Sequence, residues 1–161
     1  MVRKILVSIV FLVVVLVGCN RTDQELRFRS ILDNESGEVL VIGDSSERVR
    51  EVLGEPGFIT DSGSYRFFED YLGNPALTLG FNPELGLTSI SIAENSERFE
   101  FHMTVDEVRN NFEYFGRAYA RLYDANDNLL TDQDFEDDNL AYVISVTIIS
   151  ERISSINIMY W

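Results

Sequence analysis

Two short segments of the chain, one in each half, have the residue spacing of an amphipathic helix. Apolar side chains recur about one or two helical turns apart in both, at Val49, Val52 and Leu53 in the first segment and at Val108, Phe112 and Phe115 in the second. Side chains at this spacing share one face of a helix. Each segment therefore predicts a short helix that lays a single apolar stripe on a core.

Both segments also begin and end with residues that bound helices. An oxygen-bearing side chain is followed three residues later by a glutamate in Asp44–Glu47 and in Thr104–Glu107, and this pair can close a capping box. At the far ends, Gly54–Pro56 stops the first helix and Gly116 stops the second.

Extended segments follow each helix and are separated by turn-forming residues. The predicted strands are 65–71, 76–81 and 88–93 in the first half, and 117–123, 141–149 and 154–160 in the second. The last strand of each half contains the pattern polar-polar-Ile-polar-Ile, at residues 88–92 and 154–158. A period of two places the isoleucines on one buried face of a sheet.

The matching order of helix and strands indicates an internal repeat. The alternative is chance, because short capped helices and strands with alternating isoleucines are common. The sequence predicts an α+β fold made of two tandem repeats, each a helix followed by a three-stranded antiparallel meander, with both helices on one face of the sheet. The repeats span about 39–96 and 97–161, and together form one domain.

The N-terminal residues follow a different pattern. Arg3 and Lys4 precede the apolar run Ile5–Val17, and the last two residues of this run begin the segment Leu16-Val17-Gly18-Cys19. A transmembrane helix needs about 20 apolar residues, whereas the apolar part of a secretory signal needs about 7 to 15. The order resembles the signal peptide and lipobox of bacterial lipoproteins. An uncleaved anchor, or ordinary secretion with a free thiol, is the alternative.

The lipoprotein resemblance implies removal of residues 1–18 and acylation of Cys19. Two or three acyl chains hold a protein stably in a bilayer, whereas one chain holds it only marginally. Residues 19–38 are then predicted to be a lipidated tether, and residues 39–161 a domain in the cell envelope. In lipoproteins, an aspartate directly after the acylated cysteine favours retention in the inner membrane. This chain has Asn20 at that position, so the outer membrane is favoured.

Charge and cysteine content narrow the possible partners. The chain has 13 basic and 27 acidic side chains, a formal net charge of −14, and loss of Arg3 and Lys4 brings this to −16. Such a surface repels nucleic acid, so we predict no nucleic-acid partner. The acidity serves solubility or attracts a cationic partner. Because Cys19 is the only cysteine, no disulfide is available and stability must come from a packed core.

The segment Ile42–Pro56 resembles the opening of the SmpA/OmlA (BamE-like) lipoproteins, and the duplicated helix-and-strand unit resembles the β-lactamase inhibitory protein fold. The second half departs from this pattern, because His102-Met103 replaces Gly43-Asp44 and no proline follows Gly116. The resemblance implies a non-enzymatic protein-binding or scaffold module, with outer-membrane protein assembly as its setting. The alternative is an inhibitor-like or small-ligand-binding lipoprotein of the periplasm or cell surface.

Catalytic and metal chemistry finds little support in the pattern. His102 is the only histidine, which argues against sites built from several imidazoles, and its apolar neighbours favour a structural role over that of a lone general base. In the acidic turn 124–138, Asp124, Asn126 and Asn128 match the first calcium ligands of an EF-hand. Leu129 and Phe135 occupy the positions that need glycine and glutamate. We predict no enzyme, cofactor or metal site, and a solvated hairpin tip, with Ca²⁺ binding by this turn left open.

Tyr119, Arg121 and Tyr123 alternate along one predicted strand and share one of its faces. Tyrosine and arginine are favoured at interfaces, so these residues form a possible interaction surface. Packing in the core is the alternative for the same three residues. We predict that a protein partner binds the sheet face that the helices leave uncovered.

Overall fold

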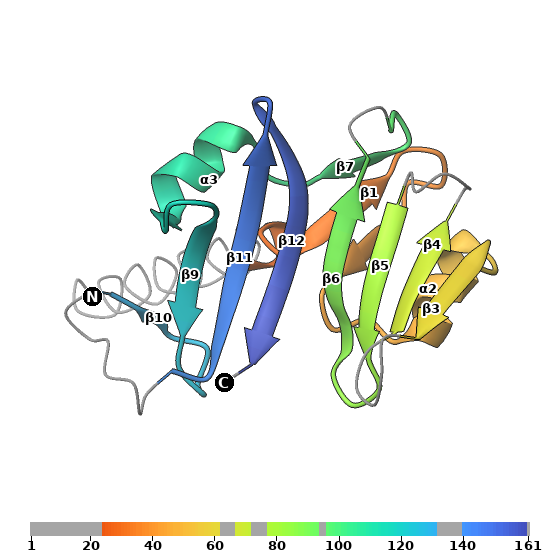
Figure 1. Cartoon of the computed structure of the whole chain (residues 1–161), viewed down its shortest axis with the longest axis horizontal. Helices are drawn as coiled ribbons and strands as arrows, with labels where there is room; N and C mark the ends of the chain where they lie inside the picture. Colours follow the sequence, from red (N-terminus) through yellow and green to blue (C-terminus); the bar gives the residue numbers. More distant parts are fainter. Residues whose placement is uncertain (1–23, 62–66, 72–76, 94–95, 132–139, 161) are drawn as a thin grey trace, which may run out of the picture.

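The protein is mostly β. The computed structural model describes residues 24–61, 67–71, 77–93, 96–131 and 140–160, and it is 49% strand and 17% helix. Two antiparallel sheets, one of nine strands and one of three, form the fold (Figure 1). Among these described residues, no helix is long and apolar enough to cross a membrane.

The larger sheet runs across the whole molecule. Its strands follow in the order β10 (Leu129–Leu130), β9 (Tyr119–Tyr123), β11 (Tyr142–Ile149), β12 (Arg152–Tyr160), β6 (Gly86–Ile92), β5 (Leu77–Asn82), β4 (Phe67–Tyr71) and β3 (Phe58–Asp61), and β8 (Glu113–Tyr114) pairs with β9. The strands from the two halves of the chain meet where β12 pairs with β6.

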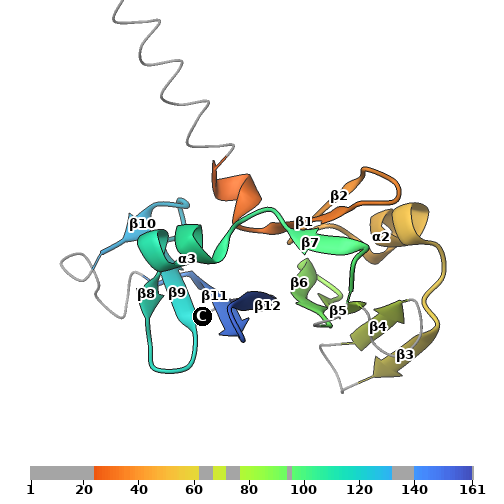
Figure 2. The same cartoon turned by 90° about the horizontal axis from the view of Figure 1, so that it is seen from above.

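A second layer covers one side of the larger sheet. It contains the small sheet β2 (Val39–Val41), β1 (Ser30–Asp33) and β7 (Phe99–Phe101), the helices α2 (Ser46–Leu53) and α3 (Val105–Asn111), and the helical residues 24–27. Figure 2 shows these elements together on one side, while no helix or strand of the described residues lies on the opposite face of the nine-stranded sheet. The outer strands β3–β4 and β8–β9 bend toward that uncovered side.

The predicted α+β fold of two helix-plus-meander repeats with helices on one face is wrong. The structure has a nine-stranded sheet and a small sheet with short helices. Among the described residues, five strands follow α2 and five follow α3, rather than three in each half. The extra strands had no alternating pattern to reveal them: β3 is exposed at all four positions, and β7, β8 and β10 are three residues long or shorter.

The six predicted strands do correspond to β4, β5, β6, β9, β11 and β12. The capping box at Thr104 is also confirmed, since the Thr104 hydroxyl accepts from Glu107 N at 3.1 Å and the Glu107 carboxylate accepts from Thr104 N at 2.8 Å. Helix α2 is capped by Ser45 instead of Asp44, because the Asp44 carboxylate accepts from Val41 N at 2.8 Å. Helix α3 ends at Asn111, before Gly116.

The predicted tether 19–38 is wrong from residue 24 onward. Strand β1 is the central strand of the small sheet, and Phe28 and Ile31 are 1% and 0% exposed. Their apolar side chains are therefore part of the domain core instead of scattered contacts along a polar linker. Residues 1–23, including the predicted signal peptide and Cys19, lie outside the described residues.

The interior is divided into two apolar clusters, one beneath each half of the larger sheet. The second-half cluster is formed by Phe28, Met103, Val108, Phe112, Tyr123, Tyr142, Ile144, Val146, Ile156 and Ile158. The first-half cluster is formed by Ile31, Leu40, Val49, Tyr71, Leu77, Leu79, Phe81, Leu87, Ile90 and Phe99. Ile42 and Phe101 pack against both clusters and join them under the layer of helices and small strands.

Candidate binding surface

His102 takes part in a partly buried hydrogen bond that links β1 to the residue after β7. Its Nδ1 lies 2.9 Å from the Ser30 hydroxyl, and Ser30 is 1% exposed. A nucleophile needs contact with its substrate as well as a base, and this hydroxyl is shut away from solvent. Among the described carboxylates, none forms an ion pair with His102. The pair therefore ties strands together.

The described part of the acidic turn uses its oxygens for local hydrogen bonds. The Asp124 carboxylate accepts from Asn126 N at 2.8 Å and from the backbone and side chain of Asn128 at 2.9 Å each. These bonds, first among them that from the Asn128 side chain, lower the pKa of Asp124. Asp127 accepts from the Tyr142 hydroxyl at 2.6 Å. Within the described residues no group of three potential metal ligands occurs, and residues 132–139 lie outside them.

Tyr119, Arg121 and Tyr123 face the covered side of the sheet and do not form an exposed patch. Arg121 is 8% and Tyr123 1% exposed, and Tyr119 is half-buried. The Arg121 guanidinium lies 4.9 Å from the ring centre of Phe28 and pairs with Glu25 at 3.0 Å. Arg121 and Tyr123 therefore pack in the core and do not form the predicted interaction surface.

Arg29 completes this aromatic group. Its guanidinium lies 5.3 Å from the ring centres of both Tyr123 and Tyr142, which stack at 4.8 Å, and it donates to the Tyr142 hydroxyl at 2.7 Å. Burial raises the pKa of both tyrosine hydroxyls. Glu25 and Arg29 were not predicted from the sequence, because both fall in the predicted tether. The available signal was the grouping of four apolar residues, Leu26, Phe28, Ile31 and Leu32, within seven positions.

The uncovered face of the larger sheet is built from cross-strand rows of side chains. Residues paired in antiparallel strands point to the same face, so the register identifies each row. One row contains Thr147, Ser155, Ser91 and Thr78, and the next contains Ala120, Ser145, Asn157, Ser89 and Gly80. We call these two the polar rows. They extend over the central strands β11, β12, β6 and β5.

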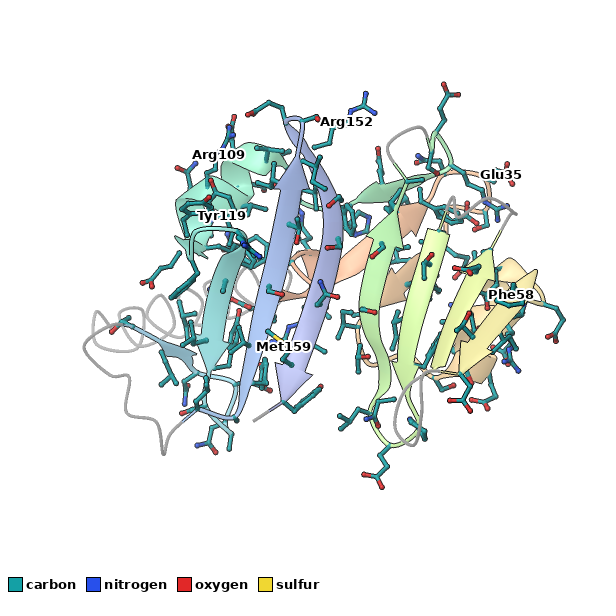
Figure 3. All side chains as sticks on the ribbon, viewed as in Figure 1. Glu35, Phe58, Arg109, Tyr119, Arg152 and Met159 are labelled. Atoms are coloured by element: carbon teal, nitrogen blue, oxygen red, sulfur yellow. The ribbon has the colours of Figure 1, made fainter. Side chains whose placement is uncertain are left out.

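A third row beside the polar rows is apolar. Leu130, Leu122, Val143 and Met159 are consecutive register partners across β10, β9, β11 and β12. Met159 is 43% exposed and the other three are half-buried. Figure 3 shows Met159 on the larger sheet, apart from Arg109 and Tyr119 at the α3 end. The apolar row therefore offers side chains that a partner can cover.

No member of these three rows is charged, although the chain carries a net charge of −14. The register continues one polar row to Asp70 on β4 and then to Phe58 on the edge strand β3, and it continues the other polar row to Glu113 on β8, at the opposite edge of the sheet. Asp70 accepts from the Thr78 hydroxyl at 2.6 Å. The face thus has an uncharged centre, with one carboxylate toward each edge of the sheet.

The molecule is hollowed at the junction of its halves, where β6 and β12 separate. A hollow of about 230 Å³ lies beside the polar rows and is lined by Gly80, Thr88, Ser89, Ser145, Asn157, Ile158 and Met159. Near the opposite ends of the same strands, a groove of about 380 Å³ is lined mainly by apolar side chains, including Ile92, Phe99, Phe101, Met103, Ile149 and Ile153.

Comparisons with protein-family models, with curated proteins and with solved structures find no match for this chain. The family resemblance of Ile42–Pro56 therefore stays a prediction.

Proposed function

We propose that this chain is an envelope lipoprotein, held in a bilayer by acylated Cys19, whose domain is a non-enzymatic protein-binding module. The outer membrane is favoured over the inner, and outer-membrane protein assembly is the setting that the resemblance of Ile42–Pro56 implies. The observation that carries the binding role is the uncovered face, where two uncharged polar rows lie beside an apolar row.

This composition suits contact with another protein. Covering a charged side chain without a partner costs far more than covering a hydroxyl or an amide that finds a hydrogen bond. The cores of protein interfaces are accordingly poor in charged residues. The uncovered face of this acidic domain has no charge in its centre, and it therefore costs less to dehydrate than a charged surface would.

The charged residues toward the edges of this face indicate the chemistry of the partner. Asp70 and Glu113 lie toward opposite edges of the uncovered face, and charges at the rim of an interface steer association and disfavour partners of like charge. The partner surface that fits has uncharged polar and apolar groups in its centre, with arginine or lysine side chains at its rim.

A cross-linking experiment in intact envelopes tests this function. A photo-activatable amino acid replaces Asn157 on the uncovered face or, as a matched control, Asn110, which is exposed on α3. We expect position 157 to cross-link a protein that position 110 does not, and the purified protein should then bind the domain. The Met159→Arg substitution should weaken that binding more than Asn110→Arg does. Identical adducts from both positions would contradict the proposal.

A second candidate function is binding of a small apolar ligand, which the groove of about 380 Å³ beside β7 favours. Titration with an uncharged apolar fluorophore tests it, with Ile153→Glu inside the groove and Ser91→Glu on the uncovered face as the paired variants. Saturable binding that is lost only in Ile153→Glu would favour the ligand-binding role.

A further inference from the structure

The folded part of the domain begins very close to the predicted anchor. The first described residues are held by several contacts: Glu25 accepts from the Tyr123 hydroxyl at 2.7 Å, and Arg27 pairs with Glu107 at 3.0 Å. The ring of Phe28 lies 5.2 Å from that of Phe112, edge to face. These contacts connect residues 25–28 to β9 and α3. The N-terminal segment cannot leave the domain surface without uncovering part of the core.

The length of chain between Cys19 and Gln24 then limits how far the domain can lie from a bilayer. Five residue steps reach ~18 Å at full extension, whatever path the chain takes. A domain of this length has a radius of gyration of about 14 Å and is therefore roughly 35 Å across. The link is shorter than the domain is wide. The face opposite the point where the link enters the domain therefore cannot be turned toward the membrane.

The side on which the chain enters is also defined. In Figure 2, the helical residues 24–27 lie with α3 and the small sheet, on the side opposite to the uncovered face. Leu26 is 50% exposed there, which allows it to contact the interfacial layer of a bilayer. Glu100 on β7 and Asn110 on α3 are exposed as well, so this side is not an apolar surface that would insert deeply.

We propose that the short link orients the domain, with α3 and the small sheet toward the bilayer and the uncovered face directed away from it. This inference rests on the proposed acylation of Cys19. It identifies the partner as a protein, or a part of one, that projects into the aqueous compartment, because a surface embedded in the same membrane could not reach the polar rows. The anchor therefore determines the direction from which the partner approaches.

Energy transfer to an acceptor-labelled lipid tests this orientation in the full acylated chain reconstituted in vesicles. Because Cys19 is the only cysteine and is blocked by acylation, an introduced cysteine is the only free thiol. A donor dye is attached to Asn110→Cys on α3 or to Ser91→Cys on the uncovered face, both exposed positions. We expect higher transfer efficiency from position 110 than from position 91.

Two controls separate the orientation from the anchoring. A Gly/Ser insertion of 20 residues between Asn20 and Arg21 adds ~25 Å of flexible reach, so it should remove the difference between the two positions while both still show transfer. Equal or reversed efficiencies without the insertion would overturn the orientation and leave the anchor intact. Absence of transfer from both positions, as expected for Cys19→Ser, would overturn the anchor and the orientation with it.

Discussion

Ile90 on β6 and Ile156 on β12 lie directly opposite each other at the junction of the two halves of the nine-stranded sheet. Each is 0% exposed, and each belongs to a different apolar cluster. Only one register pair on each side of them, Ser155 with Ser91 and Asn157 with Ser89, completes the pairing of β6 with β12. This isoleucine pair is therefore the apolar contact that joins the two cores within the sheet.

Truncation of this pair should destabilise the whole domain. Ile156→Ala removes buried methyl groups and leaves a cavity, a change that costs roughly 2–5 kcal/mol. The free energy of unfolding, measured by urea denaturation, should fall by that amount. The control is Ile59→Ala on the edge strand β3, where the side chain is 49% exposed, and its loss should stay below about 1 kcal/mol. A loss for Ile156→Ala as small as that of the control would mean that the junction contributes little.

Gly86 should tolerate no side chain. Its φ is +76°, and a Cβ there would lie 2.5 Å from the carbonyl oxygen of Gly43 and 2.7 Å from that of Asp44. Both contacts are to backbone, which cannot move aside because Leu87 N donates to Asp44 O at 2.8 Å. Gly86→Ala therefore combines the cost of the left-handed conformation, about 1–2 kcal/mol, with a steric clash.

Gly37 provides the matched control for that substitution. Its φ is +74°, but nothing lies within 4 Å of the added Cβ, so Gly37→Ala should cost only about 1–2 kcal/mol. Thermal unfolding of the two variants should show a larger decrease in the melting temperature for Gly86→Ala. Equal decreases would indicate that the backbone around Gly43 relaxes and that the close approach has no energetic consequence.

The buried carboxylate of Asp33 should make stability depend on pH at the acidic end. Arg98 donates two hydrogen bonds to it, at 2.7 and 2.8 Å, and these, followed by bonds from Ser36 and Glu35 N, lower the pKa of Asp33 from 3.8 to about 2. Because the pKa is lower in the folded state, this stabilisation is fully present above about pH 4 and is lost as the pH falls toward 2. It corresponds to roughly 2 kcal/mol.

Comparison with Asp33→Asn isolates that contribution from the other carboxylates. The difference in unfolding free energy between the parent chain and Asp33→Asn should be largest at pH 5–7 and should shrink between pH 4 and 2. The control is Glu84→Gln, which changes an exposed carboxylate in the turn between β5 and β6 and should give a nearly constant difference. A constant difference for Asp33→Asn would show that the ion pair does not perturb the titration of Asp33.

Strands with one buried face could be predicted because their residues alternate. In β12, Ile156 and Ile158 are buried while the intervening Asn157 points to the uncovered face. Strand β3 offered no such contrast, since all four of its residues are exposed at the sheet edge. In β1 the alternation of buried apolar and exposed polar residues is broken by Asp33, a fully buried carboxylate. An aspartate is expected at the surface, and the partner that allows its burial, Arg98, is 65 positions away in the sequence.

The candidate surface could not be predicted, because it is formed by pairing between strands that are far apart in the sequence. The pentamers 88–92 and 154–158 were recognised as similar, but only the structure shows that they pair with each other and so create the polar rows. Arg121 and Tyr123 have the composition of an interface, and they are buried because Glu25 and Phe28 cover them. Both covering residues come from the segment that composition assigned to a tether.

Truncation of the chain tests that correction directly. A shortened protein that begins at Val39, the predicted start of the domain, lacks Phe28, Ile31 and the central strand of the small sheet. Loss of a buried phenylalanine side chain alone costs about 3–5 kcal/mol, and of an isoleucine about 2–5. Together these losses approach the 5–15 kcal/mol that stabilises an ordinary domain. We expect this protein to be largely unfolded.

A protein that begins at Gln24 is the matched control, because it keeps every contact made by Glu25, Arg27 and Phe28. It should unfold cooperatively in urea and show dispersed amide signals by NMR, whereas the protein beginning at Val39 should show neither. Phe28→Ala in the longer protein should lose about 3–5 kcal/mol while remaining folded. If the protein beginning at Val39 unfolded as cooperatively as the longer one, residues 24–38 would be a tether after all. The link between Cys19 and the domain would then be too long to orient the domain.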